Sequence, residues 1–412
     1  MAARCAIAFG RYLRTLRERR RLSLDDVGSL SRTFADPVTK SYLSRVENGR
    51  ISLALSKMIP LSRIYEIPPE VLLERLELDM ELDKVGGPDT ELLDYAELTQ
   101  RGKVAIDRGY VWDAYGYFRD AVQVAAVSPL FGRLRDHVEQ LLCAFMNLSG
   151  AAMKLGRARL ACHELRYIRA SQGLSGRFGP LLMERLATAY LAMNEVKSAC
   201  EWADAAIAQA EANQDSEYLG YLYSSRARIA LEASDARGAL LLFQKAFDAY
   251  REAGSNSECA VTLYNLAWTY YSMGRRKSAR RALASADRLA APLQQLRTRA
   301  LNRILLGEIE ETENQLAAAE QHWLEAVSMA RQLDDKTIRF RAEYFLYRQA
   351  LMTGRSLAAR SIEKRLRRSA AWISQDVAEL DAFRRLSSTH SSRARRQVVG
   401  VQPAAAPTGN PQ

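Results

Sequence analysis

The sequence lacks several features that would place it in well-known protein classes. It contains no run of 18 or more apolar residues, so we expect no membrane-spanning helix. The start of the chain, Met1–Gly10, has no long apolar stretch of the kind found in secretory signals, and we expect a cytoplasmic protein. The five cysteines are far apart, which predicts reduced thiols instead of a disulfide framework or a paired metal site.

Recognisable catalytic motifs are also missing. There is no Gly-rich phosphate loop with a lysine, no H-E-x-x-H and no nucleophile elbow. The four histidines are scattered, and the adjacent Cys162 and His163 would point to different faces of a helix. We therefore predict a protein that is not an enzyme and that binds no cofactor or metal.

Positive charge is concentrated at the two ends of the chain. Residues 1–66 hold 13 Lys and Arg against 6 Asp and Glu, and residues 355–412 hold 11 against 4. The residues between them are slightly acidic. A basic end suits a polyanion such as DNA, because neutralising phosphates releases counterions. For the C-terminal end, a general arginine bias of the composition is the alternative explanation.

The first 80 residues read as five short helices. A helix over Phe9–Arg21 is followed by one capped by Ser23, with Asp26 at the capping-box position. The third helix runs from about Thr39 to Glu47 and stops at an Asn-Gly pair. The fourth, Leu55–Ile67, contains Pro60, which should bend it, interrupt it or delay its start. The fifth spans Pro69–Leu78, and Gly86-Gly87-Pro88 marks a linker.

The third helix carries the most specific motif. The run SYLSRVENGR, Ser41–Arg50, closely resembles the third helix and turn of Cro/repressor-type (Xre) helix-turn-helix proteins, and LRTLRERRRLSLDD resembles their first two helices. The resemblance implies base contacts from Lys40, Ser41 and Arg45, with Arg45 suited to a bidentate pair with guanine. It also implies phosphate contacts from Ser23, Thr39, Asn48 and Arg50, and a structural ion pair between Arg17 and Glu47.

Two features depart from this family. Roughly five extra residues lie in Ser31–Val38, where a turn of three or four residues is usual. They either lengthen the turn or extend the second helix. In addition, Leu24 stands where the second helix usually begins with a polar residue that contacts a phosphate.

A repeat follows from about residue 90. One alanine recurs at intervals of 47, 38, 40, 40, 40 and 40 residues, and a turn-forming residue precedes each by five positions. The alanines are Ala114, Ala161, Ala199, Ala239, Ala279, Ala319 and Ala359, and the turn residues are Gly109, Gly156, Asn194, Ser234, Gly274, Asn314 and Gly354. The unit LYNLAWTYYSMGRRKSARRALASA, Leu263–Ala286, resembles a tetratricopeptide repeat with a longer period, like the repeats of bacterial peptide-sensing regulators.

Seven such units would stack into a superhelix with a concave inner surface. The resemblance places a peptide groove on that surface. Asparagine amides there can hold a peptide group, and arginines suit a carboxylate. The candidate groove residues are Asn147, Arg185, Arg228, Tyr264, Asn265, Trp268, Tyr344 and Arg348. Self-association of the repeats and the absence of any specific ligand remain alternatives to peptide sensing.

We therefore predict an all-α protein with a helix-turn-helix domain over residues 1–80, a linker over 81–89, tetratricopeptide-like repeats over 90–386 and a disordered basic tail over 387–412. The predicted function is a transcriptional regulator that binds double-stranded DNA as a homodimer and senses a peptide or protein partner. The alternative is a repeat scaffold whose helix-turn-helix serves protein contacts. The domain order resembles that of the peptide receptors of Gram-positive bacteria, but the Arg-rich, Lys-poor composition differs from theirs.

Overall fold

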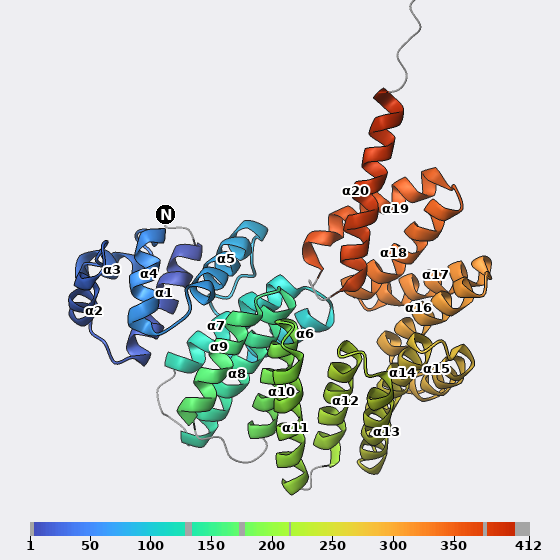
Figure 1. Cartoon of the computed structure of the whole chain (residues 1–412), viewed down its shortest axis with the longest axis horizontal. Coiled ribbons are helices and arrows are strands. Elements are labelled where there is room, and N and C mark those ends of the chain that lie inside the picture. The colour runs from blue at the N-terminus through green and yellow to red at the C-terminus, as the bar shows by residue number, and fades with distance from the viewer. Residues whose placement is uncertain (1–3, 128–133, 173–177, 214–215, 374–376, 400–412) are drawn as a thin grey trace, which may run out of the picture.

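The computed structural model describes residues 4–127, 134–172, 178–213, 216–373 and 377–399. Within these ranges the chain is built of helices joined by short turns (Figure 1). The N-terminal head consists of α1 (Arg4–Arg19), α2 (Leu24–Leu30), a 3-10 turn (Ser31–Thr33), α3 (Lys40–Glu47), α4 (Leu55–Tyr65) and α5 (Pro69–Val85). No helix of the described residues is long and apolar enough to cross a bilayer.

Seven helix pairs follow the head. They are α6 (Tyr95–Asp107) with α7 (Val111–Val127), α8 (Leu134–Lys154) with α9 (Ala158–Gln172), α10 (Phe178–Ala192) with α11 (Val196–Asn213), α12 (Ser216–Glu232) with α13 (Ala236–Glu252), α14 (Asn256–Ser272) with α15 (Arg276–Ala290), α16 (Leu296–Thr312) with α17 (Leu316–Gln332), and α18 (Lys336–Met352) with α19 (Ser356–Ser369). A 3-10 turn (Ala370–Trp372) and α20 (Ala378–Val399) complete the described chain.

The recurring small residues explain how each pair packs. All seven recurring alanines are buried, and all seven residues of the turns between paired helices have positive φ. Small residues also face the partner helix within a pair. A Cβ on Gly102 would lie 2.4 Å from the Phe118 ring, and one on Gly307 would lie 2.3 Å from Nε1 of Trp323. The predicted register of the repeat is therefore confirmed in every unit.

Several helices differ from prediction. Helix α1 spans Arg4–Arg19 instead of Phe9–Arg21, and α4 ends at Tyr65 instead of Ile67. Helix α4 begins at Leu55 and is continuous through Pro60, which is buried in its middle. Helix α5 extends to Val85 and ends at Gly86 in a left-handed cap, so residues 81–85 are helical and not linker. Helix α20 covers residues 387–399 of the predicted disordered tail, because that segment has no Gly or Pro before residue 400. The remainder of the predicted tail, 400–412, lies outside the described residues.

The head and the first repeats share one hydrophobic core. Buried residues of α1, α3, α4 and α5 belong to the same cluster as residues of α6 to α9, including Tyr115, Phe118 and Leu160. Helix α5 packs against both α1 and α9. The head is consequently docked on the repeats through buried side chains and is not tethered by a free linker (Figure 1).

The superhelix also contacts itself across a long sequence separation. The α6–α7 turn meets the α17–α18 turn, where the Lys336 amide donates to the Arg108 carbonyl at 3.0 Å. The Tyr110 hydroxyl donates to the Asp334 carboxylate at 2.8 Å, and the Lys336 ammonium lies 3.6 Å from the centre of the Tyr110 ring. These contacts join the first repeat to the sixth and seventh, so the repeats form a closed turn of superhelix.

Candidate DNA-binding surface and repeat pocket

The orientation of α3 is fixed by its packing on α1. Leu43 and Val46 are fully buried, while the N-terminus of α3 is capped by the Thr39 hydroxyl, which accepts from the Tyr42 amide at 3.2 Å. At the other end α1 approaches very closely, because a Cβ on Gly10 would lie 2.3 Å from the Val46 carbonyl oxygen. Only a glycine permits this backbone contact.

A buried ion pair ties the same two helices together. Nε and Nη2 of Arg17 donate to the two Glu47 carboxylate oxygens at 2.7 and 2.9 Å, a bidentate arrangement. The Glu47 side chain is 1% exposed and that of Arg17 is 12% exposed. The hydrogen bond to Glu47 raises the pKa of Arg17 above its ordinary value. Arg17 also donates to the Leu22 carbonyl, so it links α1, α3 and the start of α2.

The three predicted base-contact residues lie on the outer face of α3. Lys40, Ser41 and Arg45 are all exposed. Lys40 donates to the Asp25 carboxylate at 2.7 Å across two exposed side chains, a pair of the kind that contributes little to stability. Nε of Arg45 lies 3.4 Å from the Ser41 carbonyl, and its guanidinium is directed to solvent.

The predicted phosphate-contact residues are mainly helix caps in the structure. Ser23 caps α2 and accepts from the Asp26 amide at 3.1 Å. Thr39 caps α3, as described above. The Asn48 backbone amide and its Nδ2 both donate to the Ser44 carbonyl, so both amides of Asn48 serve the end of α3. Arg50 is exposed directly after this cap. Ser23, Thr39 and Arg50 remain on the surface that surrounds α3.

The long connection between α2 and α3 is ordered. Its first residues continue α2 as a 3-10 turn, and the buried Ser31 hydroxyl accepts from the Val38 amide at 2.9 Å. Asp36 in the same connection accepts from Ser56 at 2.6 Å and from Lys57. The extra residues therefore extend the second helix and then attach the connection to α4.

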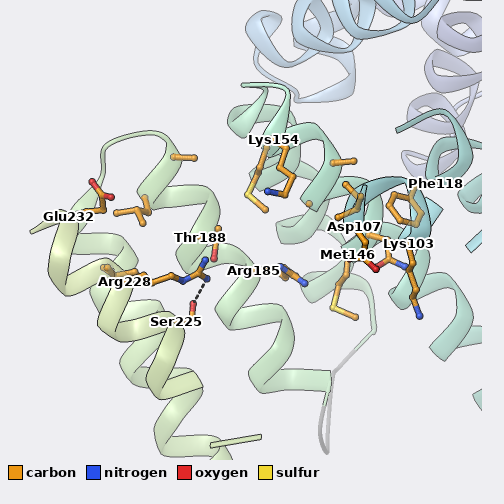
Figure 2. A pocket seen from close by; sticks show the side chains of 18 of the residues that line it. Lys103, Asp107, Phe118, Met146, Lys154, Arg185, Thr188, Ser225, Arg228 and Glu232 are labelled. Carbon is orange, nitrogen blue, oxygen red and sulfur yellow. Dashed lines mark hydrogen bonds between the residues drawn. The ribbon is translucent and has the colours of Figure 1, made fainter. Parts of the chain in front are cut away.

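The first half of the repeat superhelix contains a large pocket. Its volume is about 720 Å³, and α6, α8, α10 and α12 contribute most of its lining (Figure 2). Three predicted groove residues, Asn147, Arg185 and Arg228, line it together. Lys103 and Lys154 add positive charge, and Asp107 and Glu232 are the acidic lining residues. Cationic groups thus outnumber carboxylates in this pocket by four to two.

The buried carboxylate of Glu184 links α10 to α12, two of the helices that line the pocket. The carboxylate accepts from Ser225 at 2.6 Å, Thr188 at 3.0 Å and Tyr221 at 2.8 Å, and it lies 3.8 Å from Nε of Arg185. Arg228 Nη2 lies 3.5 Å from Ser225 Oγ (Figure 2). Sequence reasoning missed Glu184, because its neighbours in space come from two different repeats.

The other five predicted groove residues do not line this pocket. Tyr344 is buried beside Phe345, with ring centres 5.4 Å apart, and the Arg348 guanidinium pairs with Glu311. Tyr264 lies beside Arg341, which pairs with Glu379 of α20 at 2.9 Å. Asn265 is half-buried and Trp268 is 40% exposed. Five of the eight predicted groove residues therefore lie outside this pocket, and two arginines there, Arg341 and Arg348, are paired with glutamates.

Comparisons with known proteins bear on the fold. A family model described as a helix-turn-helix domain matches residues 8–76. No curated protein matches the sequence. The chain is similar to a signal transduction ATPase with a tetratricopeptide repeat sensor from Pyrococcus horikoshii, with 14% identity and a TM-score of 0.50 over 84% of this chain and 50% of that chain.

Two other solved structures are similar at lower scores. PlcR from Bacillus thuringiensis, solved with a peptide and DNA, is 15% identical, with a TM-score of 0.42 over 72% of this chain and 99% of that chain. Aspartyl phosphate phosphatase F from Bacillus subtilis is 12% identical, with a TM-score of 0.48 over 92% of this chain and 96% of that chain. The predicted fold class, an N-terminal helix-turn-helix followed by a tetratricopeptide-like α-solenoid, is confirmed.

Proposed function

We propose that this chain is a transcriptional regulator that reads double-stranded DNA with α3. The observation that carries the proposal is the contrast between the two faces of this helix. One face is fixed by buried Leu43 and Val46 and by the Arg17–Glu47 pair, while the other presents exposed Lys40, Ser41 and Arg45. A rigid helix with exposed basic side chains suits the major groove, where Arg45 can take guanine O6 and N7 in a bidentate pair.

Contacts to the DNA backbone form the second part of the proposal. Ser23, Thr39 and Arg50 surround α3 and can approach phosphates, whereas Asn48 can do so only by giving up part of its capping role. The excess of basic residues in residues 1–66 supports attraction of the head to DNA. A single head contacts few phosphates, so we propose a homodimer that sets two heads on half-sites about 34 Å apart.

For the repeats we propose a peptide or protein partner that brings a carboxylate to Arg185 and Arg228. The surplus of cations in the pocket supports this ligand class, and Asn147 offers an amide that both donates and accepts. The pocket residues come from successive repeats, so a ligand there would contact several units at once.

Electrophoretic mobility shifts with fragments of the source genome test the DNA-reading part. The wild-type chain should bind a subset of fragments, with an affinity that falls steeply as salt rises. Arg45→Ala should lose this selection, whereas Arg237→Ala, which removes an exposed arginine of α13, should keep it. Identical binding by all three proteins, or by none, would instead favour a scaffold whose helix-turn-helix contacts proteins.

Thermal unfolding with short synthetic peptides tests the pocket. Peptides with a free C-terminal carboxylate should stabilise the chain, and their amidated forms should not. Arg228→Gln should remove the stabilisation, and Arg348→Gln should retain it, because Arg348 is paired with Glu311 outside the pocket. Equal stabilisation by free and amidated peptides would contradict carboxylate recognition.

A further inference from the structure

A second, smaller cavity lies where the head meets the repeats. It has a volume of about 90 Å³ and is lined by residues of α1, α5, α7, α8 and α9. It is separate from the repeat pocket, since the two share no lining residue. Apolar side chains form much of its wall, among them Val122, Phe145, Leu148 and Leu160. Four arginines line it as well, which is unusual for a cavity with so much apolar surface: Arg11, Arg19, Arg75 and Arg119.

These arginines form a network that joins the head to the repeats. Nη2 of Arg19 donates to the buried Glu164 carboxylate at 2.8 Å, and the Tyr12 hydroxyl donates to the same carboxylate at 2.9 Å. The guanidinium of Arg19 also lies 3.9 Å from the centre of the Tyr167 ring. Although burial opposes ionisation, the neighbouring Arg19 keeps the pKa of Glu164 below its ordinary value.

A second part of the network involves Arg75 and Arg119. Nε of Arg75 donates to Asp79 at 2.8 Å, and Nη1 of Arg119 lies 3.3 Å from the same carboxylate. Arg119 also donates to Asp120 at 2.8 Å. Three arginines of the lining therefore face three carboxylates, Glu164, Asp79 and Asp120. The excess positive charge is that of Arg11, which is exposed and donates to the side-chain oxygen of Gln123 at 2.9 Å.

Two buried polar atoms of the lining residues have no partner among the described residues. They are Nη1 of Arg19 and the hydroxyl oxygen of Tyr115, whose side chain is completely buried. A buried donor without an acceptor costs free energy, so such atoms are normally satisfied by protein, water or ligand. An apolar wall, an excess positive charge and unsatisfied donors describe a site for a small anion with an apolar body.

We propose that this cavity binds a short-chain carboxylate. The carboxylate would accept from Arg19 and Tyr115 and neutralise the excess charge, while the alkyl chain would lie against the apolar wall. The volume limits the size of the ligand. An apolar cavity of about 150 Å³ holds benzene, which has six non-hydrogen atoms, so a cavity of this size accommodates about four such atoms, the size of acetate. Because its wall includes both α1 and α7 to α9, the ligand would strengthen the junction between head and repeats.

Thermal unfolding of the full chain with acetate tests the proposal, with calorimetric titration to measure affinity. Chloride at equal ionic strength, acetamide and ethanol serve as controls, and butyrate, which has as many non-hydrogen atoms as benzene, tests the size limit. Acetate should raise the unfolding temperature in a saturable manner, and the controls and butyrate should not. An equal shift with chloride, with the neutral compounds or with butyrate, or no shift with acetate, would overturn the proposal.

Two variants locate the binding site. Val122→Phe fills the cavity from α7 and should abolish the shift, and Tyr115→Phe removes one unsatisfied hydroxyl without changing the ring. Tyr115→Phe should leave the unliganded chain at least as stable as the wild type and weaken carboxylate affinity about tenfold, the loss of one hydrogen bond to a charged group. Arg237→Gln, which changes an exposed arginine of α13 that lines neither cavity, is the control and should bind normally. Unchanged affinity in Tyr115→Phe, even if Val122→Phe does not fold, would contradict the assigned site.

Discussion

The head and the repeat superhelix use their basic side chains in different ways. On α3, none of the carboxylates in the described residues lies within salt-bridge distance of Arg45. In the later repeats, arginines are paired with glutamates. Arg348 pairs with Glu311, and Arg341 pairs with Glu379. The comparison teaches that a count of basic residues identifies a binding surface poorly. The useful observation is which cations are left without a carboxylate partner.

In the repeat pocket, Arg228 resembles Arg45 of the head in this respect. Its Nη2 atom lies 3.5 Å from the Ser225 hydroxyl, and no carboxylate of the described residues lies within salt-bridge distance of it, whereas Nε of Arg185 lies 3.8 Å from the Glu184 carboxylate. Both arginines line the pocket (Figure 2). The first half of the superhelix therefore contains an open basic pocket, whereas arginines of the second half, Arg341 and Arg348, are paired with glutamates.

Removing the buried carboxylate of the head should have the largest effect. Glu47→Ala leaves the Arg17 guanidinium buried without its partner, and we expect a loss of about 3–5 kcal/mol in the free energy of unfolding. Asp25→Ala, which breaks the exposed pair with Lys40, should cost less than about 1 kcal/mol. Urea unfolding monitored by circular dichroism gives both values. Equal losses would mean that the buried pair does not orient α3.

The close approach of α1 and α3 offers the next largest effect. Gly10→Ala places a Cβ 2.3 Å from the Val46 carbonyl oxygen, so the helices must separate, at a cost of about 2 kcal/mol. Gly150→Ala on α8 is the matched control, since no atom lies within 4 Å of its added Cβ. It should be neutral or slightly stabilising. Chemical denaturation of the two variants measures the difference, and a stable Gly10→Ala would contradict the described contact.

The free energy of unfolding should depend on pH through Glu308, which lies in the second half of the repeats. Burial, followed by the neighbouring Glu379, raises the pKa of Glu308 from 4.5 to about 7, against opposing effects of Arg341 and Arg348. The folded chain therefore retains a proton that the unfolded chain releases, and the resulting stabilisation is present below pH 4.5 and lost as the pH rises through 7.

Glu308→Gln removes this titration without a large change in volume. As the pH rises from 4.5 to 7.5, the free energy of unfolding of the variant should increase relative to that of the wild type by roughly 2 kcal/mol. One pKa unit corresponds to about 1.4 kcal/mol, and the value is reduced from the full shift because Glu308 is partly exposed to solvent. Free energies of unfolding measured across this range test the prediction. A constant difference between the two proteins would show that Glu308 titrates normally.

The contact that closes the superhelix should give the smallest effect. Lys336→Met removes the ammonium that lies over Tyr110 and should destabilise the chain by about 1 kcal/mol. Lys245→Met, whose ammonium lies 5.3 Å from the Tyr223 ring within one helix pair, is the control. Small-angle scattering should detect a more open superhelix only for Lys336→Met. No change in either variant would indicate that the backbone contact alone maintains closure.

Much of the fold could be predicted from the sequence because its signals are local. The repeating Ala and turn residues determine how each helix pair packs, and Ser23 and Thr39 cap helices at the expected positions. The Arg17–Glu47 contact was predictable only through a family resemblance, since 30 residues separate the partners. The end of α5 was not predicted, because the helix continues across Met80–Val85 to pack on the repeats before Gly86.

The binding sites were less predictable because they depend on contacts between distant repeats. Asn147, Arg185 and Arg228 could be placed together from their repeat positions. The neutralisation of Arg348 by Glu311 and of Arg341 by Glu379 required knowledge of how α16, α18 and α20 pack. The cavity between head and repeats had no sequence signal, because its arginines come from α1, α5 and α7.

The central claim is that the exposed side chains of α3 read a DNA sequence. Selection from random DNA duplexes at physiological salt, performed with the full-length wild type and with Arg45→Ala, tests it most directly. The wild type should enrich a motif that contains a guanine, and Arg45→Ala should lose preference at that guanine while retaining weaker binding. Enrichment of the same motif by both proteins, or of none by the wild type, would contradict the claim.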